Sequence, residues 1–208
     1  MKLKNYIAGQ WVEGSGEGQM LYDASTGAEV AIASTEGIDL GTAFDFARKV
    51  GNPKLRKMAF RERGMMLKNL AFYLMERKEK YYDVSYKTGA TRVDSWIDIE
   101  GGIGNLFANA SLRRKFPDLP YTTEGDPIGL SKGGTFVGHH ILVPKEGVAI
   151  HINAFNFPIW GMLEKCAVNW LAGMPAIVKP ATLTSFLTEA MVHDIIASSI
   201  LPQGAVQL

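Results

Sequence analysis

The spacing of hydrophobic positions changes along the chain and divides it into four segments. Residues 5–32 contain short apolar and aromatic runs broken by glycine-rich turns, which predicts small antiparallel strands. Over residues 39–115 apolar side chains recur every three or four positions, which predicts a layer of helices. Residues 117–142 join a stretch rich in proline and glycine to a strand-like run, and we expect an insertion or hairpin there. Residues 147–208 show a fourth pattern.

Three helices are expected within the helical layer. Gly51 and Pro53 should end the first, since both residues interrupt helices. The next two each present one apolar face, formed by Met66, Leu67, Leu70 and Leu74 and by Trp96, Ile99, Ile103 and Leu106. The glycines of EGGIG, residues 100–104, fall inside the third pattern, where they favour close packing of another backbone over phosphate binding. The sequence GSGEG, residues 14–18, precedes no helical pattern and is interpreted as a surface turn.

The fourth segment alternates strands and helices with short connections. The predicted order is strand, helix, strand, helix, strand, over residues 147–152, 158–171, 175–179, 185–199 and 204–208. This order is typical of a parallel sheet wound with crossover helices, so the fold class is predicted to be α/β. Such sheets bind ligands at the carboxyl ends of their strands.

Composition narrows the classes of partner. The chain has 208 residues, 47% of them hydrophobic, a net charge of +1 and a single cysteine. The balanced charge disfavours nucleic acid and anionic membranes as partners, and one cysteine cannot form an internal disulfide framework. The sequence MKLKNYIAGQWVEG lacks the apolar region of a signal peptide, and no apolar run reaches the length of a membrane span. We therefore expect a cytoplasmic protein that binds a small molecule or another chain.

Two polar residues follow predicted strands of the sheet. Asn156 precedes Phe157 and Pro158 at the start of a helix, where an asparagine commonly caps the helix. Its NH2 group would equally suit the stabilisation of an oxyanion on a carbonyl substrate. Lys179 could be a solvated strand-end charge, or it could reach over the crevice to a ribose or phosphate. Both alternatives stay open on the residues alone.

Other candidates are weaker. Cys166 falls within an apolar helix and is interpreted as a small core side chain, with no histidine expected nearby. His139 and His140 are adjacent on a strand and point to opposite faces, so they cannot share a metal. His151 lies in a buried strand, which favours a hydrogen-bonded structural role. No zinc spacing, Walker loop or Ser/His/Asp signature occurs, and no metal site is predicted.

Several strings resemble the aldehyde dehydrogenase superfamily. INAFNFP, followed by Lys165 and LAGMPAIVKPAT, is similar to its asparagine turn and its lysine-proline-alanine strand end. YIAGQWV resembles its opening hairpin, RERGMMLKNLAFYL its early amphipathic helix, and LPQGAVQL its third nucleotide-binding strand. The resemblance spans the chain and implies an aldehyde dehydrogenase-like fold with the first half of a doubly wound nucleotide-binding sheet.

A narrower resemblance concerns the substrate. TGATRVDSWIDIEGGIG, together with the long string from His151 to Thr182, resembles the dehydrogenase part of bifunctional phenylacetate-degradation enzymes, which oxidise a ring-opened coenzyme A semialdehyde. Semialdehyde dehydrogenases of the benzoyl-coenzyme A pathway are the alternative. The implied substrate is an aldehyde linked to coenzyme A, and the implied full-length enzyme is a homo-oligomer.

The resemblance also implies roles for individual residues. Asn156 matches the oxyanion-hole asparagine, and Lys165 matches a helix lysine linked to the general base and its proton relay. Four positions match the wall beside the nicotinamide: Ile152, Asn153, Ala154 and Phe155. Ala154 and Phe155 replace the usual proline and tryptophan. The strand-end segment at the adenosine ribose is Lys179, Pro180, Ala181 and Thr182.

The same resemblance implies that the nucleophilic cysteine and the base glutamate lie downstream of Leu208. The chain is therefore expected to be an N-terminal fragment, inactive alone, of a dehydrogenase. Thr182 stands where many members carry a glutamate that repels a 2′-phosphate, which implies NADP, or NAD, as cofactor with a preference for NADP. The competing hypothesis is a stand-alone, non-catalytic nucleotide-binding or interaction module.

Overall fold

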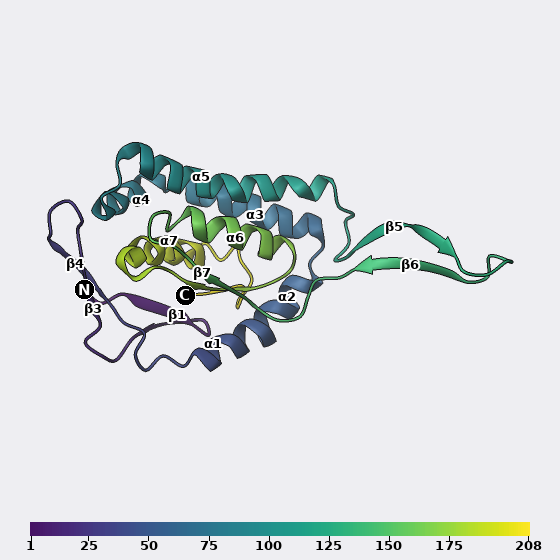
Figure 1. Ribbon diagram of the computed structural model, residues 1–208, viewed down its shortest axis with the longest axis horizontal. Helices are drawn as coiled ribbons and strands as arrows, with labels where there is room; N and C mark the ends of the chain where they lie inside the picture. The colour runs from purple at the N-terminus through teal and green to yellow at the C-terminus, as the bar shows by residue number, and fades with distance from the viewer.

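The computed structural model describes residues 1–208 as helices and strands packed around one main core, with one long arm (Figure 1). Four short strands open the chain as two antiparallel pairs, β1 with β2 and β3 with β4. The four strands are β1 (Lys4–Ile7), β2 (Gln10–Glu13), β3 (Gln19–Tyr22) and β4 (Glu29–Ala33). These pairs confirm the small antiparallel strands expected from the glycine-rich turns.

The helical segment follows, but its helices do not form one layer: α3, α4 and α5 lie on one side of the later sheet, and α1 and α2 lie on the other (Figure 1). It consists of α1 (Leu40–Phe46), a π-helical turn (Ala47–Gly51), α2 (Asn52–Lys57), α3 (Phe60–Met75), α4 (Lys78–Ser85) and α5 (Arg92–Ser111). The predicted apolar face of α3 is buried throughout, at Met66, Leu67, Leu70 and Leu74. On α5, Ile99, Ile103 and Leu106 are also fully buried. The spacing of apolar residues therefore identified the core of this segment.

Two details of this segment differ from the prediction. Gly51 and Pro53 do not end a helix, because the π-helical turn runs directly into α2 and Pro53 sits in the first turn of α2. A proline is tolerated there, since its missing N–H would have no partner in a first turn anyway. Trp96 is 55% exposed and does not join the buried face of α5. The apolar spacing at this position therefore did not predict burial, because tertiary packing decides it.

The glycines of α5 permit the close approach that their position predicted. A methyl group on Gly102 would lie 3.0 Å from Trp160 Cα, and one on Gly101 would overlap the Trp160 ring. Gly104 differs, because nothing lies within 4 Å of the place a Cβ would take. Gly101 and Gly102 thus let the start of α6 (Trp160–Leu171) approach α5 closely.

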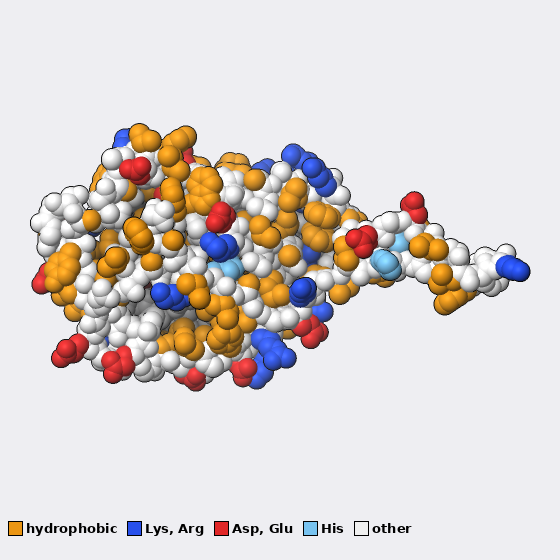
Figure 2. Space-filling model, in the orientation of Figure 1, with side chains coloured by type: hydrophobic (Ala, Val, Ile, Leu, Met, Phe, Trp, Pro, Cys, Tyr) orange, Lys and Arg blue, Asp and Glu red, His pale blue; other side chains and the backbone are white.

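Residues 122–142 form a hairpin arm that projects from the body of the molecule (Figure 1). Its strands are β5 (Thr122–Gly129) and β6 (Val137–Leu142), which pair antiparallel. His139 and His140 lie on β6 and do not share a ligand: His139 Nε2 is 2.9 Å from the Gly125 carbonyl oxygen, and His140 faces Glu124. Several apolar side chains of the arm are exposed (Figure 2), namely Ile128, Leu130, Phe136, Val137, Ile141 and Leu142.

The last segment is a parallel sheet with crossover helices, as its alternating pattern predicted. Its order is β7-β8-β9, and its elements are β7 (Ala149–Ile152), α6 (Trp160–Leu171), β8 (Ala176–Lys179), a 3-10 turn (Thr182–Thr184), α7 (Ser185–Ala197) and β9 (Val206–Gln207). The central strand β8 is buried on both faces up to Lys179. The carboxyl ends of β7 and β8 lie side by side, since Ile152 is in register with Lys179.

No helix is both long and apolar enough to cross a lipid bilayer. No cluster of three or more histidine, cysteine, aspartate or glutamate side chains is arranged to hold a metal ion. The fold as a whole is α/β, with α3 to α7 on one side of the parallel sheet, α1 and α2 on the other, and β1 hydrogen-bonded beside the end of β9 (Figure 1).

Candidate functional site

The turn that carries Asn156 begins where β7 ends. The backbone N–H of Asn153 donates to the carbonyl oxygen of Lys179 at 3.0 Å, which joins the ends of β7 and β8. Asn156 follows three residues later and is exposed, and its side chain makes no hydrogen bond within the chain. A free amide at the carboxyl end of a parallel strand can donate to a bound carbonyl oxygen. The structure thus brings Asn156 and Lys179 to the same edge of the sheet.

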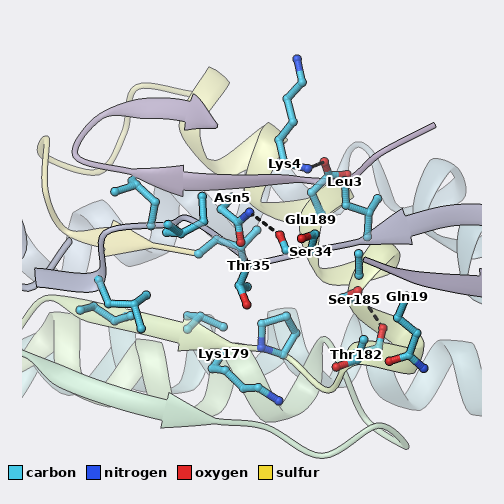
Figure 3. Close-up of a pocket in the computed structure, with 18 residues that line it drawn as sticks. Leu3, Lys4, Asn5, Gln19, Ser34, Thr35, Lys179, Thr182, Ser185 and Glu189 are labelled. Atoms are coloured by element: carbon cyan, nitrogen blue, oxygen red, sulfur yellow. Dashed lines mark hydrogen bonds between the residues drawn. The ribbon is translucent and has the colours of Figure 1, made fainter. Parts of the chain in front are cut away.

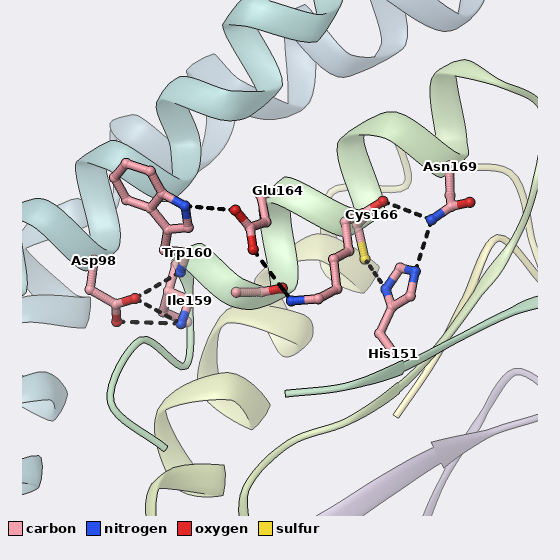
Figure 4. Close-up of polar contacts among 9 residues, drawn as sticks. Asp98, His151, Ile159, Trp160, Glu164, Cys166 and Asn169 are labelled. Atoms are coloured by element: carbon pink, nitrogen blue, oxygen red, sulfur yellow. Dashed lines mark hydrogen bonds and ion pairs between the residues drawn. The ribbon is translucent and has the colours of Figure 1, made fainter. Parts of the chain in front are cut away.

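Asn156 does not cap α6, so the capping alternative is wrong. The N–H groups at the start of the helix donate instead to Asp98, which lies on α5 (Figure 4). Asp98 Oδ1 accepts from Trp160 N at 2.7 Å and from Ile159 N at 3.1 Å. A carboxylate from another helix has taken the role that a local asparagine commonly fills.

Asp98 is a functional candidate that sequence reasoning missed. It is buried, and burial raises the pKa of its carboxyl group to about 6, against the opposing effect of the two backbone N–H groups of Trp160 and Ile159. No lysine or arginine forms an ion pair with it. The available signal was an acidic residue one helical turn before Gly102, on the same face as the buried isoleucines of α5.

Lys165 lies on α6 and borders a groove between α5, α6 and β7. Its Nζ donates to the Gly161 carbonyl oxygen at 2.7 Å and lies 3.4 Å from Glu164 Oε1 (Figure 4). The side chain is 40% exposed, so its ammonium can still reach a group in the groove. Glu164 also accepts from Trp160 Nε1 at 2.9 Å, which ties Lys165 to the first turn of α6.

The residues of the predicted nicotinamide wall take two different orientations. Ile152, Ala154 and Phe155 are exposed at the end of β7. Asn153 is only 6% exposed, and neither atom of its side-chain amide has a hydrogen-bond partner in the chain. Asn153 therefore lies beneath the turn, whereas the other three residues line its surface.

The strand-end segment of β8 borders a cavity of about 270 Å³ (Figure 3). Lys179, Pro180 and Thr182 form one side of it, and the N-terminal strands and residues 34–40 form the other. Lys179 is exposed and forms no ion pair within the chain, and the Thr182 hydroxyl makes no hydrogen bond. Only the carbonyl oxygen of Thr182 is used, accepting from Ser185 Oγ at 2.8 Å. Ala181 precedes this 3-10 turn in an extended conformation and caps it without a side-chain bond. Both Lys179 and Thr182 thus keep polar groups free for a ligand.

Cys166 lies closer to a histidine than the sequence suggested. Its Sγ is 3.6 Å from His151 Nδ1, and Asn169 Nδ2 is 2.9 Å from His151 Nε2 (Figure 4). The expectation that no histidine lies near Cys166 is wrong, because β7 and α6 bring the two together across one face of the sheet. The hydrogen-bonded role expected for His151 is confirmed.

This Cys/His/Asn group is nevertheless not arranged for nucleophilic attack. Asn169 Nδ2 also donates to the Lys165 carbonyl oxygen at 2.9 Å, which identifies that atom as the amide nitrogen. His151 Nε2 therefore accepts, and the neutral ring carries its proton on Nδ1, facing the sulfur. The pKa of Cys166 is raised by complete burial, and the pKa of His151 is lowered by burial and by Lys165. Cys166 is a core thiol, as expected.

Comparison with known proteins identifies the family. The model of the aldehyde dehydrogenase family matches residues 11–208. The chain is 41% identical to the 3,4-dehydroadipyl-CoA semialdehyde dehydrogenase of Aromatoleum evansii, with 100% of the chain and 41% of that protein covered. It is 26% identical to malonate-semialdehyde dehydrogenase 2 of Geobacillus thermodenitrificans, with 99% and 41% covered.

A solved structure gives the same fold. The NADP-dependent glyceraldehyde-3-phosphate dehydrogenase of Bacillus halodurans C-125, complexed with NADP, superposes with a TM-score of 0.83 at 21% identity over 100% of the chain and 43% of that protein. The chain thus spans about two fifths of the length of the relatives it matches. Because the family model matches residues 11–208, this chain belongs to the aldehyde dehydrogenase family.

Proposed function

We propose that this chain supplies the oxyanion donor and the first half of the dinucleotide site of an aldehyde dehydrogenase that oxidises a coenzyme A-linked semialdehyde to the acid. The observation that carries the proposal is the free, exposed amide of Asn156 on the turn that leaves β7, at the same edge of the sheet as the strand-end Lys179. Because the chain covers 41% of its curated relative, the nucleophilic cysteine and the base glutamate would come from residues outside it.

Asn156 has one task in this reaction. When a thiolate attacks the aldehyde carbon, negative charge develops on the carbonyl oxygen, and a donor fixed in advance stabilises that charge. The NH2 group of Asn156 is suited to this, because it is neutral and has no competing partner in the chain. Lys165 would hold a charge near the path of proton release, from its place in the groove beside α5.

The free groups at the end of β8 fit a dinucleotide. Bound NAD or NADP would accept the hydride from the substrate. In our proposal the Lys179 ammonium and the Thr182 hydroxyl bind the adenosine ribose, and Pro180 and Ala181 set the path of the backbone between them. The exposed Ile152, Ala154 and Phe155 form the wall beside the nicotinamide, with Asn153 supporting it from below.

We expect the enzyme to bind NADP at least as well as NAD. No carboxylate stands at position 182 to repel a 2′-phosphate, and Lys179 offers it a positive charge. A charge-assisted contact of about 1.5 to 3 kcal/mol corresponds to roughly ten- to a hundred-fold in affinity. Thr182→Glu should therefore raise the KM for NADP far more than the KM for NAD, as measured by steady-state kinetics of the full-length enzyme.

Thr182→Ser is the matched control for this substitution, because it keeps the hydroxyl and adds no charge. It should leave the ratio of the two KM values near that of the wild type. An unchanged ratio in Thr182→Glu, or a strong wild-type preference for NAD, would show that another residue sets the cofactor preference.

The proposed substrate class is an aldehyde linked to coenzyme A, in aromatic degradation of the phenylacetate type. Its support is the 41% identity with a dehydrogenase named for a coenzyme A semialdehyde. The benzoyl-coenzyme A pathway is the alternative within the same class of substrate. Comparing kcat/KM for a coenzyme A-linked semialdehyde and for the same aldehyde without coenzyme A tests this: equal values would remove the coenzyme A part of the proposal.

We further propose that the full-length enzyme is a cytoplasmic homo-oligomer, with the hairpin arm as part of its interface. Exposed apolar side chains run along β5 and β6 on an arm that touches little of its own chain (Figures 1 and 2). An apolar arm of this kind is stabilised when a second copy covers it. Light scattering of the full-length enzyme should give a multiple of the subunit mass, and Phe136→Asp should lower that mass. A monomeric wild type would contradict the proposal.

A further inference from the structure

The turn that carries Asn156 is held from both sides by residues outside it. On its helix side, Asp98 of α5 accepts from the N–H groups of Ile159 and Trp160 (Figure 4). On its strand side, the hydroxyl of Thr184 donates to the carbonyl oxygen of Phe155 at 3.1 Å. The two anchors therefore lie one residue before Asn156 and three residues after it, on separate elements.

The contact with Asp98 depends on how closely α5 and α6 approach. Gly102 lies one helical turn after Asp98 and faces Ile159 and Trp160, where a methyl group would stand 3.0 Å from Trp160 Cα. The missing side chain at this position brings the backbone of Trp160 within reach of the carboxylate. A shift of α6 away from α5 would break both hydrogen bonds at once.

A carboxylate is a costly choice for this contact. Asp98 is 4% exposed and has no cationic partner, so its charge is compensated chiefly by two backbone N–H groups and the helix N-terminus. An asparagine or serine within the turn would cap α6 at lower cost. A carboxylate on α5 fixes the distance between the turn and α5. A cap within the turn could not do this.

We propose that Asp98 and Thr184 are positioning residues that fix the turn so that the Asn156 amide is held ready for the substrate oxygen, an inference that rests on the proposed role of Asn156. Pro158 assists by fixing its own backbone angle and by having no N–H that needs a partner. Catalytic donors need such support, because a misplacement of about 1 Å can cost roughly a hundred-fold in rate.

Hydrogen exchange of the full-length enzyme tests the anchors directly. In Asp98→Ala, the N–H groups of Ile159 and Trp160 lose their acceptor, and exchange over residues 155–160 should rise by roughly ten-fold or more. Thr184→Val should raise exchange in the same segment, while Thr184→Ser, which keeps the hydroxyl, should not. Amides of α3 should be unaffected in all three variants. Asp83→Ala, at an exposed position of α4, is the matched control.

Kinetics of the full-length enzyme tests the catalytic consequence. Thr184→Val and Asp98→Ala should lower kcat by roughly ten- to a hundred-fold, with the KM for the dinucleotide little changed. Thr184→Ser, which keeps the hydroxyl, should have a kcat close to that of the wild type. The decisive comparison repeats these substitutions in an Asn156→Ala background, where loss of an anchor should have no further effect on kcat, because there is no donor left to position.

The inference would be overturned by an unchanged turn in Asp98→Ala and Thr184→Val, or by an equal fall in kcat with and without Asn156. The second result would mean that the anchors act through general stability. If Asn156→Ala itself left kcat unchanged, the proposed oxyanion role would fail first. If Asn156→Ala lowered kcat but the anchor variants did not, only the positioning inference would be lost. Thr184→Val leaves Asp98 in place, so the test survives if Asp98→Ala does not fold.

Discussion

Asn156→Ala should lower the kcat of the full-length enzyme by about 10² to 10³-fold, since removal of one oxyanion donor has an effect of that size in other enzymes. The amide is exposed at the end of β7 and binds nothing in the chain, so its loss leaves no partner unsatisfied and should not change stability. The KM for the dinucleotide should change little. Steady-state kinetics and urea unfolding of the same variant give both values.

Asn156→Asp sharpens this test, because it keeps the size of the side chain and replaces a donor by an anion. It should be at least as inactive as Asn156→Ala, since a carboxylate repels the developing oxyanion. Gln10→Ala, which removes an exposed amide on β2, should have no effect. A kcat for Asn156→Ala within about three-fold of the wild type would remove Asn156 from the mechanism.

Gly51→Ala should strongly destabilise the protein. Gly51 ends the π-helical turn and touches the backbone of Gly204, which leads into β9. An added methyl would overlap the Gly204 carbonyl oxygen, and the clash can be relieved only by moving one backbone. We expect a loss of about 3 kcal/mol in the free energy of unfolding, or failure to fold.

Gly104→Ala is the matched control, because Gly104 lies inside α5 with open space around its missing side chain. Here the same change should stabilise the protein by about 0.5 to 1 kcal/mol, since alanine favours a helix. Urea unfolding monitored by circular dichroism measures both variants. Equal stabilities for Gly51→Ala and Gly104→Ala would contradict the contact between the π-helical turn and Gly204.

The periodic parts of the fold could be predicted because their signal is local. The strands around Ile150 and Ile177 sit between helical patterns, and this order predicts a parallel sheet. Leu67 and Leu70 lie on the buried face that their spacing indicated. The strand-end rule then placed Lys179 beside the turn of Asn156. Resemblance to the family was needed to give roles to Lys165 and Thr182, since neither spacing nor polarity distinguishes them from surface residues.

The remaining features depend on contacts between distant segments. The cap on α6 comes from Asp98, which lies 61 residues before Ile159, so the sequence near the turn could not predict it. The approach of His151 to Cys166 arises only when α6 packs on β7. The predicted helix end at Gly51 was wrong, because a π-helical turn continues through this residue into α2. The glycine is needed there because the backbone of Gly204 lies close to it. Sequence patterns therefore gave the elements, and tertiary packing determined the supports of the site.

The most direct test of the central claim is the reduction of NADP by a coenzyme A-linked semialdehyde. It is assayed with the 208-residue chain and with the full-length enzyme, each as the wild type and as the Cys166→Ser variant. Our account predicts no reduction by the chain alone, because its one thiol is buried in the core with a raised pKa. It predicts reduction by the full-length enzyme and nearly the same rate for Cys166→Ser. Turnover by the chain alone that is abolished by Cys166→Ser would contradict the account.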